Sequence, residues 1–241
     1  MKSIKIILVA VVAAVATSCN FDISIGQTTG NGNVVTEDRE VSNFTEVKGS
    51  AGLDVYLTEG SENKVVVEAD ENLQALIETE VIDGKLRIGV VTGRNIGRAS
   101  SKKVHVTYTQ LEGIYASSGA DVIGNSVIDA PTLRLDSSSG ADLEVEVEAG
   151  EVIADCSSGA DLKIRGRADK LEADASSGSD IKAQELVVQT CYAEASSGAD
   201  ITVNVKENLT GKASSGGDIK YYGNPTAVSA KDGYSGNIRK M

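Results

Sequence analysis

Large aromatic side chains are scarce in this chain of 241 residues. Tryptophan is absent, and aromatic residues of all kinds make up 4% of the sequence. Aromatic residues normally fill much of the core of a globular domain of this size. We therefore expect an architecture that buries its backbone around small side chains, and a surface without tryptophan platforms for stacking on sugars.

Histidine occurs once, as His105 in the stretch KKVHVTY. Its alternation with Val104 and Val106 predicts a solvated position on the outer face of a strand. Zinc sites built from several histidines need partners that this chain lacks, and a Ser-His-Asp triad could use only this one histidine on an outer face. We expect no catalytic residue, no metal centre and no cofactor.

Basic residues are outnumbered, with 23 Lys and Arg against 35 Asp and Glu and a net charge of −12. Lys2 and Lys5 precede an apolar run from Ile6 to Ala16, which is too short to span a membrane and typical of a signal-peptide core. Cleavage after this run would leave 21 basic residues against 35 acidic ones. No basic patch then remains for phosphate backbones, which argues against nucleic-acid binding.

The apolar run ends in VATSC, where small residues precede Cys19 as they do in a lipobox. We expect residues 1–18 to be a lipoprotein signal peptide and Cys19 to be acylated, since stable anchoring takes more than one lipid chain. An ordinary secretory signal with an incidental cysteine is the alternative. Residues 19–40 are rich in Gly, Asn and Thr and are predicted to form a flexible tether.

One pentapeptide recurs along the second half of the chain. SSGAD occurs four times, and SSGSD and SSGGD once each. The spacing between copies is close to twenty residues, as in a solenoid. The repeated glycines are Gly119, Gly140, Gly159, Gly178, Gly198 and Gly216.

Apolar and polar residues alternate on both sides of each pentapeptide. Leu143, Val145 and Val147 alternate with glutamates, and small inward residues such as Ala173 and Ala175 precede the next copy. Period-two alternation predicts strands with one buried face. Residues 111–241 are therefore predicted to form an all-β, right-handed parallel β-helix with coils of about 19–20 residues, each made of a strand, a corner, a strand and a looser return.

The pentapeptide is predicted to be the corner of each coil, because glycine takes a positive φ at little steric cost. Three roles are open for the aspartates that follow. Their side chains can bond to free corner backbone, remain solvated, or form a weak Ca²⁺ ladder. These corner acids are Asp121, Asp142, Asp161, Asp180, Asp200 and Asp218.

Cys156 and Cys191 both fall on inward positions, two coils apart. Two coils separate strands by roughly 9.6 Å, which exceeds the Cα distance that a disulfide allows. We predict two buried free thiols. Residues 41–110 show strand patterning without the short period and are predicted to form a β-rich N-terminal lobe that continues into the helix or caps it.

The order of these motifs resembles the auto-transporter adhesin head, or GIN, domain family of Bacteroidetes lipoproteins. The likeness rests on the Ser-Gly-x-Asp corners, FTEVKGSAGLDVYLTEG near the start, DGKLRIGV in the middle and YYGNP near the end. It runs from about Phe44 to Met241. The resemblance implies the β-helix and a cell-envelope location, and carries no established biochemical activity.

The sequence favours a lipid-anchored, non-catalytic module of the outer membrane that binds a glycan, a host protein or an envelope protein. A periplasm-facing structural or assembly lipoprotein is the first alternative. A β-helix enzyme acting on polysaccharide is the second, although a repetitive acidic ladder offers no unique carboxylate pair. The stretch NFDIS after Cys19 has a single acid, Asp22, so the sequence leaves the choice between the cell surface and the periplasm open.

Overall fold

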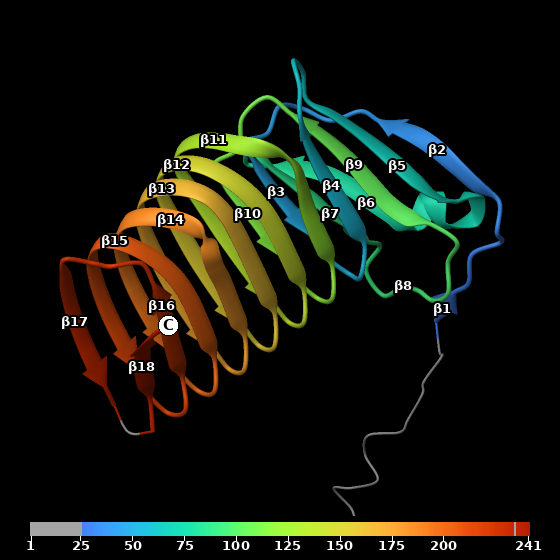
Figure 1. Cartoon of the computed structure of the whole chain (residues 1–241). Coiled ribbons are helices and arrows are strands. Elements are labelled where there is room, and N and C mark those ends of the chain that lie inside the picture. Colours follow the sequence, from blue (N-terminus) through green and yellow to red (C-terminus); the bar gives the residue numbers. More distant parts are fainter. Residues whose placement is uncertain (1–25, 234) are drawn as a thin grey trace, which may run out of the picture.

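The structure is a computed structural model that describes residues 26–233 and 235–241, and it is built almost entirely of strands (Figure 1). The N-terminal part holds β1 (Gln27–Thr28), β2 (Val34–Arg39), β3 (Glu46–Gly49), β4 (Asp54–Glu59), β5 (Lys64–Asp70), the 3₁₀ helix η1 (Glu71–Leu76), β6 (Ile77–Ile82), β7 (Lys85–Val90), β8 (Asn95–Ile96) and β9 (Lys102–Tyr108). The remainder holds β10 (Gly113–Ala116), β11 (Asp121–Ser138), β12 (Asp142–Ser157), β13 (Asp161–Ser176), β14 (Asp180–Ala195), β15 (Asp200–Ala213), β16 (Asp218–Tyr222), β17 (Ala227–Asp232) and β18 (Asn237–Lys240).

The predicted solenoid is confirmed, with about seven turns. Equivalent residues pair in parallel from one coil to the next, so that Leu143 lies beside Leu162 and Leu162 beside Ile181. This register keeps the inward alternate residues inside every coil, where they form one continuous core. The core narrows beside the corners to alanine, serine and cysteine, which explains how the chain folds with so few aromatic residues.

The looser return predicted within each coil is wrong. β11 to β15 each run without interruption from one corner to the next. The strand bends instead at irregularities in the pairing, for example between Lys163 and Arg165 and between Ala183 and Val187. A bulge of this kind bends a strand while most of its ladder bonds continue.

The N-terminal lobe is continuous with the solenoid. β3 pairs in parallel with β10, and β4 pairs in parallel with the first part of β11. Between β3 and β4 the segment around Ala51 and Gly52 has positive φ at both residues, as the corners do. This segment, SAGLD, is therefore the first corner of the stack.

The other strands of the lobe cover the outer side of this first coil, with β7 and β9 in parallel pairing and β2, β5 and β6 in antiparallel pairing. β7 and β9 stack on β3 and β4, and then β5 and β2 extend the sheet on one side and β6 on the other. Asp83 and Gly84 both have positive φ and close the β6–β7 hairpin. The lobe thereby caps one end of the solenoid (Figure 1).

Residues 26–40, the described part of the predicted tether, form strands and fixed loops and so differ from that prediction. β2 pairs along its whole length with β5, and β1 pairs with β8. The buried carboxylate of Asp70 accepts hydrogen bonds from the backbone N–H groups of Gly32, Ser100 and Ser101, at 2.5, 2.7 and 3.1 Å. The polar composition of this segment therefore reflects loops that are fixed by one buried acid. Among the described residues, no helix is long and apolar enough to cross a membrane.

Candidate functional site

The corner glycines occupy tight turns in which two successive residues have positive φ. In the copy at 117–120, Ser118 has φ 54° and Gly119 has φ 70°, and the N–H of Ala120 donates to the carbonyl of Ser117 at 3.2 Å. These are the features of a type I′ turn. The sequence predicted the left-handed glycine and missed the left-handed serine before it.

Each corner also bonds to the next one. The N–H of Gly119 donates to the carbonyl of Ser139 at 3.1 Å, and Gly140 donates to Ser158 at the same distance. The pattern continues to Gly216 and Ser235. One turn type is repeated because only identical turns can stack in this way, so the corner glycines have a structural role.

The corner acids form a single file along the outside of the solenoid. Asp121, Asp142 and Asp161 are direct neighbours in the parallel register, and the file continues through Asp180, Asp200 and Asp218. Within the described residues their carboxylates make no hydrogen bond to corner backbone, so that expectation is wrong. Lysines one coil on contact some of them instead, with Lys182 2.5 Å from Asp161 and Lys220 3.0 Å from Asp200.

The electrostatics of this file differ from one end to the other. The pKa of Asp142 is raised by partial burial and by the charges of Asp121 and Asp161. Across the described ranges, no group of three or more His, Cys, Asp or Glu side chains has the geometry of a metal site. The acids thus form a row of neighbours without converging on a point.

The remaining sequence-predicted residues also have clear positions. Cys156 and Cys191 are free and buried, as predicted, and burial raises the pKa of these thiols to about 11 and about 12. His105 is exposed, 3.1 Å from Glu68, and its ring stacks on Tyr56 with centroids 5.5 Å apart. Cys19 lies outside the described residues.

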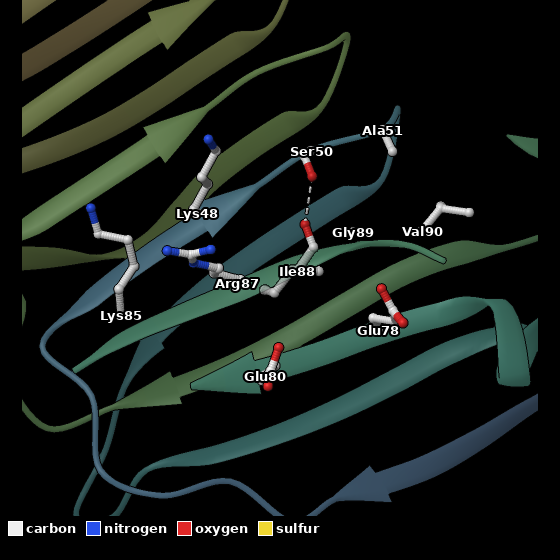
Figure 2. A pocket seen from close by; sticks show the side chains of 10 residues that line it. All are labelled: Lys48, Ser50, Ala51, Glu78, Glu80, Lys85, Arg87, Ile88, Gly89 and Val90. Carbon is white, nitrogen blue, oxygen red and sulfur yellow. Dashed lines mark hydrogen bonds between the residues drawn. The ribbon is translucent and has the colours of Figure 1, made fainter. Parts of the chain in front are cut away.

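A groove that the sequence did not reveal lies on the outer face of β3, β7 and β6 (Figure 2). It encloses about 480 Å³ and is lined by ten residues, including Ser50 and Val90. Basic side chains from β3 and β7 form one wall. Glu78 and Glu80 of β6 lie on the other side, and both are exposed.

Two cations in this groove are direct cross-strand neighbours. Lys48 of β3 pairs in register with Arg87 of β7, so their side chains leave the same face side by side. Like charges in such positions destabilise a sheet. Among residues 26–233 and 235–241, no carboxylate lies within 4.0 Å of the side-chain nitrogens of either residue. The site therefore holds two positive charges that form no ion pair within 4.0 Å, and the carboxylate nearest in register is Glu80, the cross-strand neighbour of Arg87 on β6.

The third cation of the groove is compensated. Lys85 forms an ion pair of 2.8 Å with Glu46, and its ammonium lies 3.7 Å from the centroid of the Tyr115 ring. The hydrogen bond with Glu46 raises the pKa of Lys85. This pair fixes the edge of the groove and leaves Lys48 and Arg87 as the groups available to an anion.

The groove has the chemistry to hold a ligand with an acid at one end and hydroxyl groups at the other. Arginine presents a planar fork that matches a carboxylate, and lysine adds a second charge. Glu78, Glu80 and the Ser50 hydroxyl can accept hydrogen bonds from hydroxyl groups. Alternation in DGKLRIGV indicates that Lys85 and Arg87 share an outer face, but the pairing of β7 with β3 joins segments far apart in sequence.

Four other carboxylates form a second row on the same sheet face. Asp136, Asp155, Asp174 and Glu194 follow Tyr115 in register. Burial and a neighbouring acid raise the pKa of Asp136 and of Asp174. The face therefore changes sign along the solenoid axis, from basic beside the lobe to acidic in the middle.

Comparisons with known proteins agree with this architecture. Among the solved structures that match it is a putative adhesin from Bacteroides fragilis NCTC 9343, with a TM-score of 0.82, 21% identity and coverage of 89% of this chain and 100% of that one. A putative adhesin from Parabacteroides distasonis ATCC 8503 matches with a TM-score of 0.72, 21% identity and coverage of 89% of this chain and 100% of that one. Another, from Parabacteroides merdae ATCC 43184, matches with a TM-score of 0.69, 20% identity and coverage of 90% and 99%. At these identities the likeness concerns the fold. No curated protein matches the chain.

The family model described as "Putative auto-transporter adhesin, head GIN domain" matches residues 43–225, which is more than half of the chain. The match begins just before β3 and ends after β16, so it spans the lobe, the groove and all six predicted corners. The chain therefore belongs to the auto-transporter adhesin head GIN domain family.

Proposed function

We propose that this protein is a lipid-anchored, non-catalytic binding module of the bacterial outer membrane, and that its N-terminal groove receives the acidic sugar of a glycan. The membrane assignment is supported by the basic n-region, the apolar run and the lipobox-like sequence that ends at Cys19. Membership in an adhesin head family supports a binding role at the cell envelope.

The observation that carries the proposal is the cross-strand pair of Lys48 and Arg87, neither of which forms an ion pair within 4.0 Å among the described residues. A cross-strand pair of like charges is retained at a cost in stability, and a bound anion would remove that cost. The rest of the protein is strongly acidic, with a net charge of −12. Against this background the groove is a local site for an anion.

The surrounding charge also restricts the ligand. A long polyanion would be repelled by the acidic row that begins at Asp136 and by the net charge. A single acidic residue at the end of a glycan avoids this repulsion, because only its carboxylate needs to enter the basic part of the groove. Its ring hydroxyls would donate to Glu78 and Glu80.

Location is tested by treating intact cells with proteinase and comparing them with lysed cells. Digestion of residues 41–241 on intact cells is the expected result for a surface adhesin. Protection until lysis would instead support the periplasm-facing structural lipoprotein.

Binding is tested by titrating the full chain with glucuronic acid and with glucose. We expect saturable binding of the acid, and loss of about tenfold or more in affinity in the Lys48→Ala/Arg87→Ala variant. Arg94→Ala/Lys206→Ala is the matched control, because it removes the same two charges at exposed positions elsewhere. Equal binding of both sugars, or an equal loss in the control, would contradict the proposal. Turnover of a polysaccharide by the protein would favour the alternative that it is a β-helix enzyme acting on polysaccharide.

A further inference from the structure

Among the residues that the structure describes, no strand covers the last coil of the solenoid. β17 pairs with β15 and β18 pairs with β16, and within the described ranges neither strand pairs with anything on its other edge. Figure 1 shows these two strands at the end of the stack opposite the lobe. Open strand edges offer unpaired N–H and C=O groups to another strand.

The inward row of side chains also continues into this exposed coil. Leu171, Cys191 and Leu209 are buried members of one row, and Val228 is the next member by register. Val228 is nevertheless 45% exposed. Ala230 follows the buried Gly211 in the adjacent row and is exposed as well. Core positions thus reach the surface at this end.

We infer that β17 pairs with β17 of a second copy of this chain, antiparallel and about a two-fold axis at Ser229. This arrangement places Val228 opposite Ala230 of the second copy, so inward residues meet inward residues. A slip of one residue would turn them to the solvent face. Lys231 lies opposite Ala227, so no like charges face each other along the strand.

The charge distribution favours β17 over β18 as the pairing edge. β18 carries Arg239 and Lys240 in its four residues, and charged edge strands resist pairing. The segment Ala227–Ala230 has no charge at all. A self-complementary strand is what an isologous interface requires, since the same patch serves both partners.

The two-fold axis gives a direct test in the full chain as cells make it. In Ser229→Cys, the two new cysteines would be directly opposite on antiparallel strands, with Cβ atoms about 4.5–5.5 Å apart, close enough for a disulfide after a small adjustment. The control is Thr210→Cys, since Thr210 is the outward neighbour of Ser229 one coil back and is also exposed. Both variants share the buried Cys156 and Cys191, and the unsubstituted chain reports any background from Cys19.

We expect mild oxidation to give a covalent dimer with Ser229→Cys and none with Thr210→Cys. Adding Val228→Lys to Ser229→Cys should abolish the dimer. Adding Val34→Lys should leave it unchanged, because Val34 is similarly exposed, at 41%, on β2. Absence of the dimer, equal cross-linking at residue 210, or insensitivity to Val228→Lys would overturn the inference. A cross-link to a different protein would overturn the second copy as the partner and show that β17 pairs with a strand of that protein.

Discussion

The solenoid and the N-terminal lobe are stabilised in different ways. The coils are joined by a backbone bond that recurs at each corner, with side chains in uniform rows. The lobe depends on individual buried polar groups, such as Asp70, which fixes two loops, and Gln74, which donates to backbone carbonyls of β2 and β5. Repetition therefore specifies the shape of the solenoid. The lobe, in which side chains are not repeated from one strand to the next, provides the groove.

The largest effect within the solenoid is expected where the backbone is most crowded. A Cβ atom on Gly166 would lie 2.1 Å from the carbonyl oxygen of Val147, and the residue has φ 111°. Gly166→Ala should lower the free energy of unfolding by about 3 kcal/mol, because the adjacent coil must move. Urea unfolding measures this change. A loss of unfolding free energy no larger than that caused by substituting a corner glycine would show that the strand at Gly166 can shift at little cost.

The lobe should be most sensitive at Asp70. Hydrogen bonds from the backbone of Ser101, Gly32 and Ser100 outweigh the effect of burial and lower the pKa of this carboxyl. Its stabilising contribution is therefore present above the ordinary pKa of 3.8 and is lost as the pH falls through the lower folded value. Asp70→Asn should accelerate hydrogen exchange in residues 26–33 and leave β12 to β14 unchanged. Faster exchange in the solenoid would contradict the separation between the two regions.

Corner glycines should be less sensitive than Gly166. A Cβ atom on Gly159 would meet nothing within 4 Å, so only its φ of 71° opposes substitution. Gly159→Ala should cost about 1 kcal/mol in unfolding free energy. Gly159→Asn should cost less, since asparagine tolerates the left-handed region better. Equal losses of unfolding free energy in the two variants would mean that the positive φ is not the reason for glycine at this corner.

The smallest effect is expected in the acidic row. Burial and the charges of Glu194 and Asp155 raise the pKa of Asp174, so its ionised form opposes folding. Asp174→Asn should stabilise the protein at neutral pH by less than about 1 kcal/mol, given the exposure of the site. The gain should shrink as the pH falls through the raised folded pKa toward the ordinary value, because the native carboxyl then becomes neutral. A gain that persists in acid would have another cause.

The repeat was predictable because each coil obeys the same local rules. Period-two alternation identified the inward rows, and the same spacing places Glu144 beside Lys163 and Glu146 beside Arg165, where they form ion pairs of 3.1 and 3.0 Å. The corner at Ser235 lacks the SSGAD letters and was missed, because Ser235 itself, with φ 59°, stands where the other corners have their glycine.

The lobe was harder to predict because its contacts join distant segments. Asp70 reaches loops about thirty to forty residues away in either direction. The groove depends on the insertion of the β3–β4 coil between β10–β11 and β7–β9. No local pattern specifies that order, so the neighbours Lys48 and Arg87 could not be identified from the sequence.

Hydrogen exchange of the full chain with and without saturating glucuronic acid tests most directly whether the lobe, rather than the repeat, carries the binding site. Exchange should slow in β3, β6 and β7 around the groove, and should stay the same at the corners between β11 and β16. Slower exchange along the corners, or no change in either region, would contradict the account.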